Sequence, residues 1–389
     1  MTGGLLWPGE HRAGELFSDE AVVVAMVRVE EAWLGAVTGA GHDLSGLVGP
    51  ADLPRLARDA EGGGNPVIPL VKLLRKRAGP AVAEALHTGL TSQDVLDTAI
   101  VLNLVAAIAR IKADLSVQIG EVAYLAERHR ATRMAGRTLT QHAIPITFGL
   151  KAAGWLHGLL DARDILDGAA ELPIQIGGAA GSLAAPTVLA GSPERALALV
   201  AAAAADLGLP VRAPWHTTRA PLTRAADAFV TCTDAWGKIA NDVLLGSRPE
   251  LGELSEPAVE GRGGSSAMPQ KQNPVLSVLI RRAALTAPQL AATLHLAAAE
   301  AVDERPDGSW HVEWPTLRTL ARRTVVAASQ TAELLAGLQV DAERMAATLA
   351  AARPGIDAER AKMGDDGPYL GATDQIIDGA LERAQGKPC

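Results

Sequence analysis

A glycine-rich loop at 260–274, EGRGGSSAMPQKQNP, carries residue types suited to acid–base chemistry. Glycines permit backbone conformations with positive φ, and consecutive amides can then form a nest that binds an anion. Ser265 and Ser266 lie on this backbone, with Lys271 shortly after them. Asn273 and the proline that follows it suit the N-cap and first position of a helix. The pattern indicates an anion-binding loop, although composition alone also fits an ordinary flexible connection.

A second polar segment, HTGLTSQDVLDT, occupies 87–98. Thr91 or Ser92 can cap the helix that follows and leave free amides at its positive end, which suits a carboxylate ligand. The other interpretation is that both residues are only caps. His87 is either a general acid or base, or a loop histidine.

The third polar segment, GRTLTQHAIP at 136–145, places hydrogen-bond donors beside one histidine. Arg137, Thr138 and Gln141 supply the donors, and His142 follows directly. A lone histidine is more often structural than catalytic. The density of polar groups within an apolar stretch makes a catalytic role for His142 an equal alternative.

Helical periodicity dominates the rest of the chain. The first helix is expected to start after the cap Ser18. No proline interrupts 81–144, and an apolar stripe there predicts a helix of roughly 35 residues, about 50 Å long. Such a helix must pack against others of similar length, in this chain or in a partner. Further helices are expected at about 145–169, 192–206, 222–247, 275–301 and 316–350, with a short polar connection at 352–371 before a last helix.

Strand patterns are nearly absent, and the nearest is PIQIGG at 173–178, which is too short to build a sheet. The predicted fold class is therefore all-α, a long helical bundle.

Composition excludes several classes of function. Of the 389 residues, 48% are hydrophobic and only 3% aromatic, which favours closely packed helices. A formal net charge of -8 argues against a nucleic-acid partner, and the absence of a long apolar run argues against a membrane partner. The N-terminus lacks the pattern of a signal peptide, so a cytoplasmic location is expected. The nine histidines show no metal-ligand spacing.

The three polar segments resemble the signatures of one enzyme family. GSSAMPQKQNP resembles the pattern GSSxMPxKxNP of the fumarase/aspartase superfamily, and HTGLTSQDVLDT and GRTLTQHAIPITFGLK are similar to its other two signatures, in the expected order. Finer features resemble one branch, the bacterial 3-carboxy-cis,cis-muconate cycloisomerases. They are LFSDEAVVVAMVRVE, GGGNPVIPLVK, QIGGAAGSLAA, PWHTTR and ERPDGSWHVEW.

The resemblance implies a three-part, all-α fold that assembles into a homotetramer, with each active site shared among subunits. The expected divisions are an N-terminal helical domain at 1–86, a central bundle with the signatures at 87–339, and a reduced C-terminal segment at 340–389. Family members normally have a further helical domain in this last region. Here DDGPYLGATDQIIDGAL looks like the family's final segment, joined on after most of that domain is lost.

The resemblance also implies a mechanism, in which a base removes a proton next to a substrate carboxylate through an aci-carboxylate intermediate. Ser265 matches the base, and His142 is the candidate acid. Lys271 and Asn273 match the positions that hold the substrate carboxylate. The other expected substrate contacts are His87, Thr91, Ser92, Arg137, Thr138, Gln141, Arg219, Ser266, Met268 and Arg305. The substrate would be a small di- or tricarboxylate, with no metal or organic cofactor.

Several positions depart from the family pattern. Leu139 stands where many members have a histidine, which disfavours adenylosuccinate lyase, and Val278 stands where a carboxylate is common. Ala220 replaces an aspartate, and Asp303 replaces a histidine typical of the cycloisomerase branch. The first hypothesis is cycloisomerisation of 3-carboxy-cis,cis-muconate. The alternatives are a β-eliminating lyase acting on a substituted succinate, and a non-catalytic homologue, against which the presence of Ser265 argues.

Overall fold

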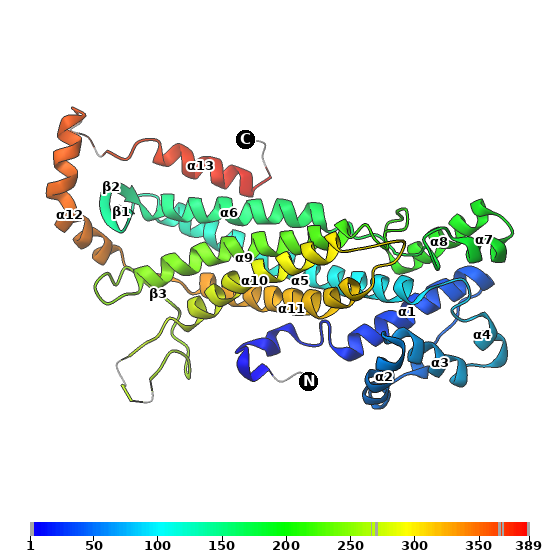
Figure 1. The fold of residues 1–389 in the computed structure, drawn as a ribbon. Helices are drawn as coiled ribbons and strands as arrows, with labels where there is room; N and C mark the ends of the chain where they lie inside the picture. The colour runs from blue at the N-terminus through cyan, green and yellow to red at the C-terminus, as the bar shows by residue number, and fades with distance from the viewer. Residues whose placement is uncertain (1–3, 266, 269–270, 365–366, 368, 387–389) are drawn as a thin grey trace. The chain divides into compact units, whose positions relative to one another are not determined.

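A computed structural model describes residues 4–265, 267–268, 271–364, 367 and 369–386 (Figure 1). The chain forms two compact units, each assembled from three stretches of sequence. The first contains described residues within 1–109, 167–227 and 289–323, and the second contains those within 110–166, 228–288 and 324–389. The expected three-part division along the sequence stays a prediction.

The fold is an all-α bundle in which long helices contribute residues to both units. These helices are α5 (Ser92–Arg128), α6 (Phe148–Ala169), α9 (Ala220–Gly246), α10 (Val275–Ala299) and α11 (Gly308–Ala336). Helix α5 has 37 residues, which confirms the predicted long helix. Its apolar stripe is buried, including Val101, Leu104, Ile111 and Leu115.

The first unit also contains shorter helices and several 3₁₀ turns. They are α1 (Asp19–Thr38), α2 (Leu53–Asp59), α3 (Val67–Arg77), α4 (Pro80–Ala85), α7 (Ala184–Ala190) and α8 (Pro193–Leu207), with 3₁₀ turns at Gly4–Leu6, Glu10–Ala13, Ser45–Leu47, Pro50–Asp52 and Glu61–Gly63. Ser18 caps α1 as expected, because its hydroxyl accepts the Ala21 N–H at 3.1 Å. Helix α1 packs against α8, and its side chains Met26, Val29 and Trp33 are buried.

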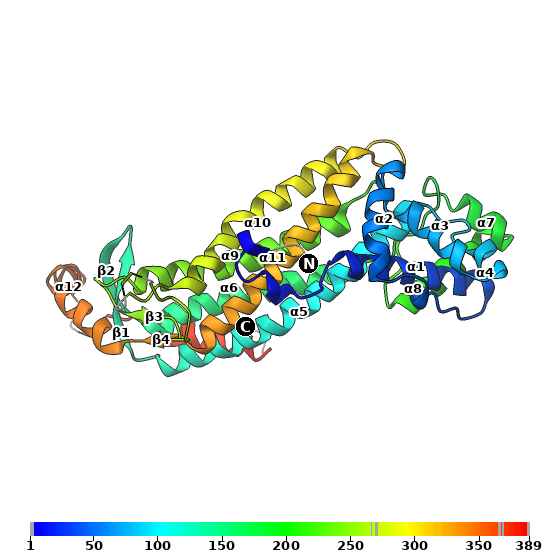
Figure 2. The same ribbon diagram turned by 90° about the horizontal axis from the view of Figure 1, so that it is seen from below.

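The second unit contains a β-hairpin that the sequence reasoning missed. Strands β1 (Arg133–Thr138) and β2 (Gln141–Thr147) pair in antiparallel register, and α12 (Ala342–Lys362) packs on them (Figure 2). Leu139 and Thr140 both have positive φ, as the tight turn between the strands requires. The polar segment at 136–145 is therefore the tip of a hairpin.

The prediction of one continuous helix at 316–350 was wrong, because this stretch forms parts of two helices separated by a short strand. Helix α11 ends at Ala336, and the two-residue strand β4 (Gln339–Val340) pairs with β3 (Leu254–Ser255) before α12 begins. Gly337 lies at the break, where a Cβ atom would come within 2.5 Å of Pro257. The connection expected at 352–371 is helical as far as Lys362, because Pro354 is accommodated within α12.

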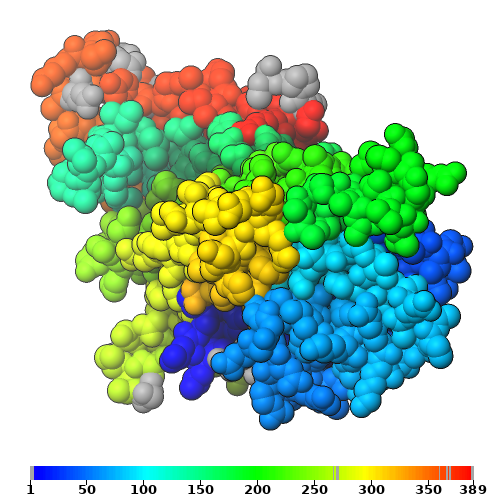
Figure 3. All heavy atoms as spheres, turned by 45° about the vertical axis from the view of Figure 1, so that its right-hand side comes forward, coloured from blue at the N-terminus to red at the C-terminus, as the bar shows by residue number. Residues whose placement is uncertain are grey.

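The last helix, α13 (Thr373–Ala384), lies along α6 in the second unit (Figure 3). Arg383 pairs with Asp161 and Asp164 of α6, each at 2.7 Å. Ile377 and Ala380, on one side of α13, are buried. Apolar contact and ion pairing together hold this C-terminal segment.

No single helix in the described part of the chain is both long and apolar enough to cross a membrane. One sharply bent pair, α7 with α8, meets the same criterion by length and composition only.

Candidate functional site

The signature loop is closed at its base by Asn273. The Asn273 N–H and its side-chain amide both donate to the Gly263 carbonyl oxygen, at 2.8 and 2.9 Å. Gly263 has φ +77°, and a Cβ atom there would lie 2.6 Å from the Asn273 carbonyl oxygen. A glycine is therefore required at this crossing point. The side-chain amide expected to hold a substrate carboxylate is instead bonded to the loop itself.

Beyond this crossing, the loop presents its polar groups outward. Ser265 is half-buried, and Met268 and Lys271 are exposed. The Lys271 N–H donates to the Met268 carbonyl at 3.0 Å, and Ser265 Oγ lies 3.4 Å from the Ala267 N–H. Ser266 falls outside the described residues.

The helix after the loop is capped by a residue that was not anticipated. The expected cap, Asn273, makes no such contact. The Glu256 carboxylate accepts the Leu276 N–H at 3.0 Å and both the N–H and the hydroxyl of Ser277, at 2.6 and 2.7 Å. A carboxylate suits this end of a helix because the helix dipole is positive there. Only three-dimensional proximity identifies Glu256, which lies nineteen residues before the first residue of α10.

Arg137, on strand β1 of the hairpin, is fixed by an ion pair. Arg137 binds Glu253 with two hydrogen bonds of 2.7 and 2.9 Å. Thr138, Gln141 and His142 are exposed, and the His142 side chain makes no hydrogen bond with a described residue. In the described part of the second unit, no hydrogen bond or ion pair joins this hairpin to the signature loop.

The first signature segment is organised by Asp94. Its carboxylate accepts the N–H of Thr91 at 3.0 Å and those of Gly177 and Gly178 at 2.9 and 3.0 Å. His216 Nε2 lies 2.8 Å from the same carboxylate. The start of α5 is thereby joined to the segments QIGG and PWHTTR. Thr91 is buried and Ser92 half-buried at this helix start.

Arg219 occupies a buried ion network next along α5. Its guanidinium lies 2.7 Å from Asp97 and 2.6 Å from Glu313, and Trp310 Nε1 donates to Asp97 at 2.8 Å. Burial lowers the pKa of Arg219, but the attraction of Asp97 and its hydrogen bonds outweigh burial, so the pKa is raised. Burial raises the pKa of Glu313, and its bond to Arg219 opposes that rise. Only 2% of the surface of Arg219 is exposed, and this burial argues against the expected direct contact with the substrate.

The remaining predicted residues of the first unit differ in setting. Arg305 is exposed, ahead of α11. His87 has positive φ and its Nδ1 lies 2.6 Å from Glu30 Oε1.

The two units divide the predicted site between them. His87, Thr91, Ser92, Arg219 and Arg305 belong to the first unit, and the residues of the hairpin and the signature loop belong to the second. Neither unit by itself contains all three signature segments.

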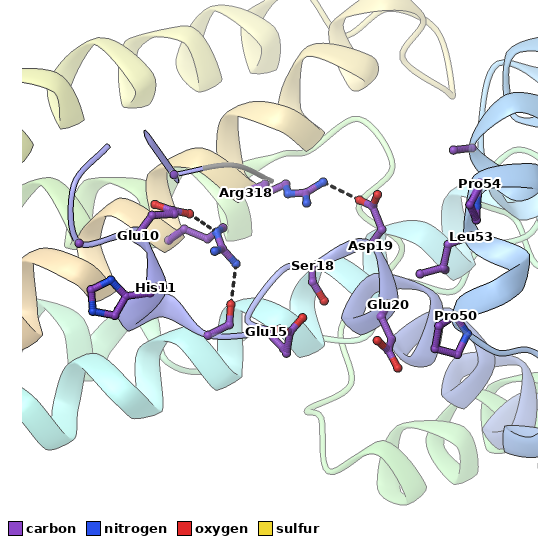
Figure 4. A pocket seen from close by; sticks show the side chains of 15 residues that line it. Glu10, His11, Glu15, Ser18, Asp19, Glu20, Pro50, Leu53, Pro54 and Arg318 are labelled. Carbon is purple, nitrogen blue, oxygen red and sulfur yellow. Dashed lines mark hydrogen bonds and ion pairs between the residues drawn. The ribbon is translucent and has the colours of Figure 1, made fainter. Parts of the chain in front are cut away.

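A separate cavity in the first unit lies away from these residues. A hollow of about 780 Å³ in the first unit is lined by the N-terminal segment, the start of α1 and part of α11 (Figure 4). Arg318 and Asp19 pair across it at 2.7 Å. None of the predicted site residues is among its described lining residues. The described part of the chain also holds no cluster of three or more histidine, cysteine or acidic residues that could bind a metal ion.

Comparison with known proteins gives consistent matches. A family model described as "Lyase" matches residues 65–288. Nitrosuccinate lyase of Streptomyces davaonensis is 47% identical over 371 residues, covering 90% of this chain and 77% of that protein. A 3-carboxy-cis,cis-muconate cycloisomerase of Bradyrhizobium diazoefficiens is 43% identical over 360 residues, covering 88% and 77%. The crystal structure of the 3-carboxy-cis,cis-muconate lactonizing enzyme from Pseudomonas putida matches with a TM-score of 0.81 at 30% identity, covering 96% of this chain and 97% of that one.

Proposed function

Because the chain belongs to the fumarase/aspartase superfamily of lyases, we propose that this enzyme catalyses β-elimination from a succinate that carries a leaving group. The observation that carries this proposal is the 47% identity to a nitrosuccinate lyase over 90% of the chain. Nitrosuccinate is accordingly the first substrate to test. This choice favours the alternative raised by the sequence over the cycloisomerase hypothesis.

The proposed reaction begins at the carbon next to one carboxylate. The Ser265 oxygen takes a proton from that carbon, and the electron pair of the C–H bond moves into the carboxylate as an aci-carboxylate. Return of these electrons forms the carbon–carbon double bond and breaks the C–N bond on the neighbouring carbon. Nitrite leaves with the bonding pair, and fumarate remains. Since nitrite is a stable anion, this reaction does not depend on proton donation by His142.

Cationic and hydrogen-bond-donating groups would stabilise the doubly charged aci-carboxylate intermediate. Lys271 is an exposed cation on the loop, and Thr91 and Ser92 lie at the positive start of α5. Each aligned donor contributes about 3 kcal/mol to lowering the barrier. Serine is a weak base in water, so closure of the loop around the substrate must exclude water and bring donors near the Ser265 oxygen. A homotetramer with shared sites would bring the three segments together. The homotetramer and the cytoplasmic location both stay predictions.

A second candidate activity is cycloisomerisation of 3-carboxy-cis,cis-muconate. It is supported by the 43% identity to a cycloisomerase and by the TM-score of 0.81 to a lactonizing enzyme. The same proton chemistry applies, with an internal carboxylate of the substrate in place of nitrite.

One comparison distinguishes the two activities. Purified protein is given nitrosuccinate while nitrite and fumarate are measured, and separately given 3-carboxymuconate while the diene absorbance is followed. Equal amounts of nitrite and fumarate, with a stable diene, are expected. Loss of the diene without nitrite release would replace the lyase proposal with the cycloisomerase.

The role of Ser265 is tested by Ser265→Ala. Loss of the proton acceptor is expected to lower kcat by at least about a hundredfold, with little change in thermal stability, because Ser265 makes only one weak hydrogen bond with a described residue. Ser247→Ala is the matched control. Ser247 directly follows α9, and its hydroxyl donates a hydrogen bond to the Leu244 carbonyl. Near-normal turnover in Ser265→Ala would remove Ser265 as the base.

A further inference from the structure

A buried glutamate lies directly behind His87 of the first signature segment. Glu30, on α1, is fully buried, and its Oε1 is 2.6 Å from His87 Nδ1. Its other oxygen, Oε2, is buried without a hydrogen-bond partner in the described part of the chain. A buried carboxylate with so little compensation is costly, so its presence on an otherwise apolar helix face needs a reason.

The backbone around His87 is held in an unusual shape by the same helix. His87 has φ +61°, a conformation that an L-residue other than glycine rarely adopts. Trp33, one turn after Glu30 on α1, donates from Nε1 to the Thr88 carbonyl at 2.8 Å. Arg75 donates to the Leu86 carbonyl at 2.8 Å, on the other side of His87. Strained backbone persists only where its surroundings fix it, and here they fix the direction of one imidazole ring.

The ring is anchored through one nitrogen and leaves the other available. Because a carboxylate only accepts hydrogen bonds, the contact places the proton on Nδ1. Nε2 makes no hydrogen bond with a described residue, and 19% of the side chain is exposed. His87 is therefore held with Nε2 as its working atom, four residues before Thr91 at the start of α5.

We propose that Glu30 is a positioning residue of the active site, which fixes the tautomer and direction of His87 so that Nε2 hydrogen-bonds an anionic oxygen of the substrate. The inference deepens the proposed function and rests on it for the identity of that substrate.

The test is a double-mutant cycle on the full-length enzyme. Glu30→Leu keeps the volume and removes the acceptor, and it is expected to lower kcat/KM about 10- to 100-fold, the worth of a hydrogen bond to a charged group. Glu30→Gln retains an acceptor and should recover part of that loss. In a His87→Ala background, Glu30→Leu should have no further effect, because Glu30 acts through His87.

Glu31→Gln is the matched control, since that neighbouring carboxylate accepts the Leu44 N–H at 2.6 Å and does not bond His87. An unchanged kcat/KM in Glu30→Leu would overturn the proposal. So would an equal fractional loss in the presence and absence of His87, which would mean that Glu30 only supports the fold. If Glu30→Leu does not fold, the same double-mutant cycle is measured with Glu30→Gln, alone and in the His87→Ala background.

A readout independent of turnover separates this inference from the proposed function. Ring ¹⁵N spectra of histidine-labelled protein, with His87→Asn to assign the signal, report which nitrogen carries the proton. A proton on Nδ1 in the wild type that is redistributed in Glu30→Gln or Glu30→Leu supports the proposal, even if no offered substrate is converted. A His87 signal that is the same in wild type and variants would overturn it.

Discussion

Arg219 lies at the centre of a buried ion network in the first unit. Its guanidinium is the counter-charge of two buried carboxylates, Asp97 and Glu313. Arg219→Met would leave both carboxylates without this counter-charge, which costs about 3 to 5 kcal/mol of unfolding free energy. We expect this loss in urea unfolding followed by circular dichroism. Arg318→Met, which removes an exposed pair with Asp19, should cost less than about 1 kcal/mol.

If Arg219→Met instead unfolded like the wild type while KM rose steeply, Arg219 would be a substrate contact and the network described here would be incidental.

Residue types and spacing located the signature segments but not the partners of their side chains. Ser265 and Lys271 could be chosen as candidates because the loop motif is local. Asp94, Glu30 and Glu256 could not, because each acts on residues far from it in the sequence or on the backbone. The carboxylates that pair with Arg219 could not be predicted either, because a lone arginine gives no indication of which acidic residues will surround it.

At the scale of elements, the long helices were predictable and the hairpin was not. An apolar stripe that keeps helical spacing over as many turns as in α5 can be interpreted only as a helix. The strands β1 and β2 are short, and their burial does not alternate, so no period of two marks them. Similarly, at the break between α11 and α12, Pro257 lies so close to Gly337 that a Cβ atom there would clash, and local propensity gives no sign of this approach.

Three helices of the second unit meet at one buried glutamine. Gln118 of α5 donates to the Ala328 carbonyl of α11 at 2.8 Å and accepts from Trp236 Nε1 of α9 at 2.6 Å. Gln118→Leu fills the space but leaves the indole N–H without an acceptor, so we expect a loss of about 1 to 3 kcal/mol in unfolding free energy. Urea titration measures it.

Gln385→Leu, an exposed glutamine after α13, is the control and should change stability by less than about 0.5 kcal/mol. Equal midpoints for the Gln118 variant and the wild type would show that the bridge contributes no net stability.

For the molecule as a whole, the arrangement of the signature segments bears on assembly. Thr91 lies in the first compact unit and Ser265 in the second, and the His142 side chain makes no hydrogen bond with a described residue. A homotetramer would allow segments from several subunits to complete one site. The long helices with alanine-rich faces suit close packing between copies.

Shared sites predict that two inactive variants can restore each other. Ser265→Ala and Thr91→Val should each have little activity alone. When the two are unfolded together, mixed in equal amounts and refolded, sites that receive the first segment from one variant and the loop from the other are intact. Random assembly makes about a quarter of the sites complete in this way, so about a quarter of wild-type activity should return. Refolding each variant alone gives the baseline, and sedimentation velocity reports the oligomer. Mixed samples that stay at the baseline, although they form tetramers, would mean that one chain supplies both segments to its own site.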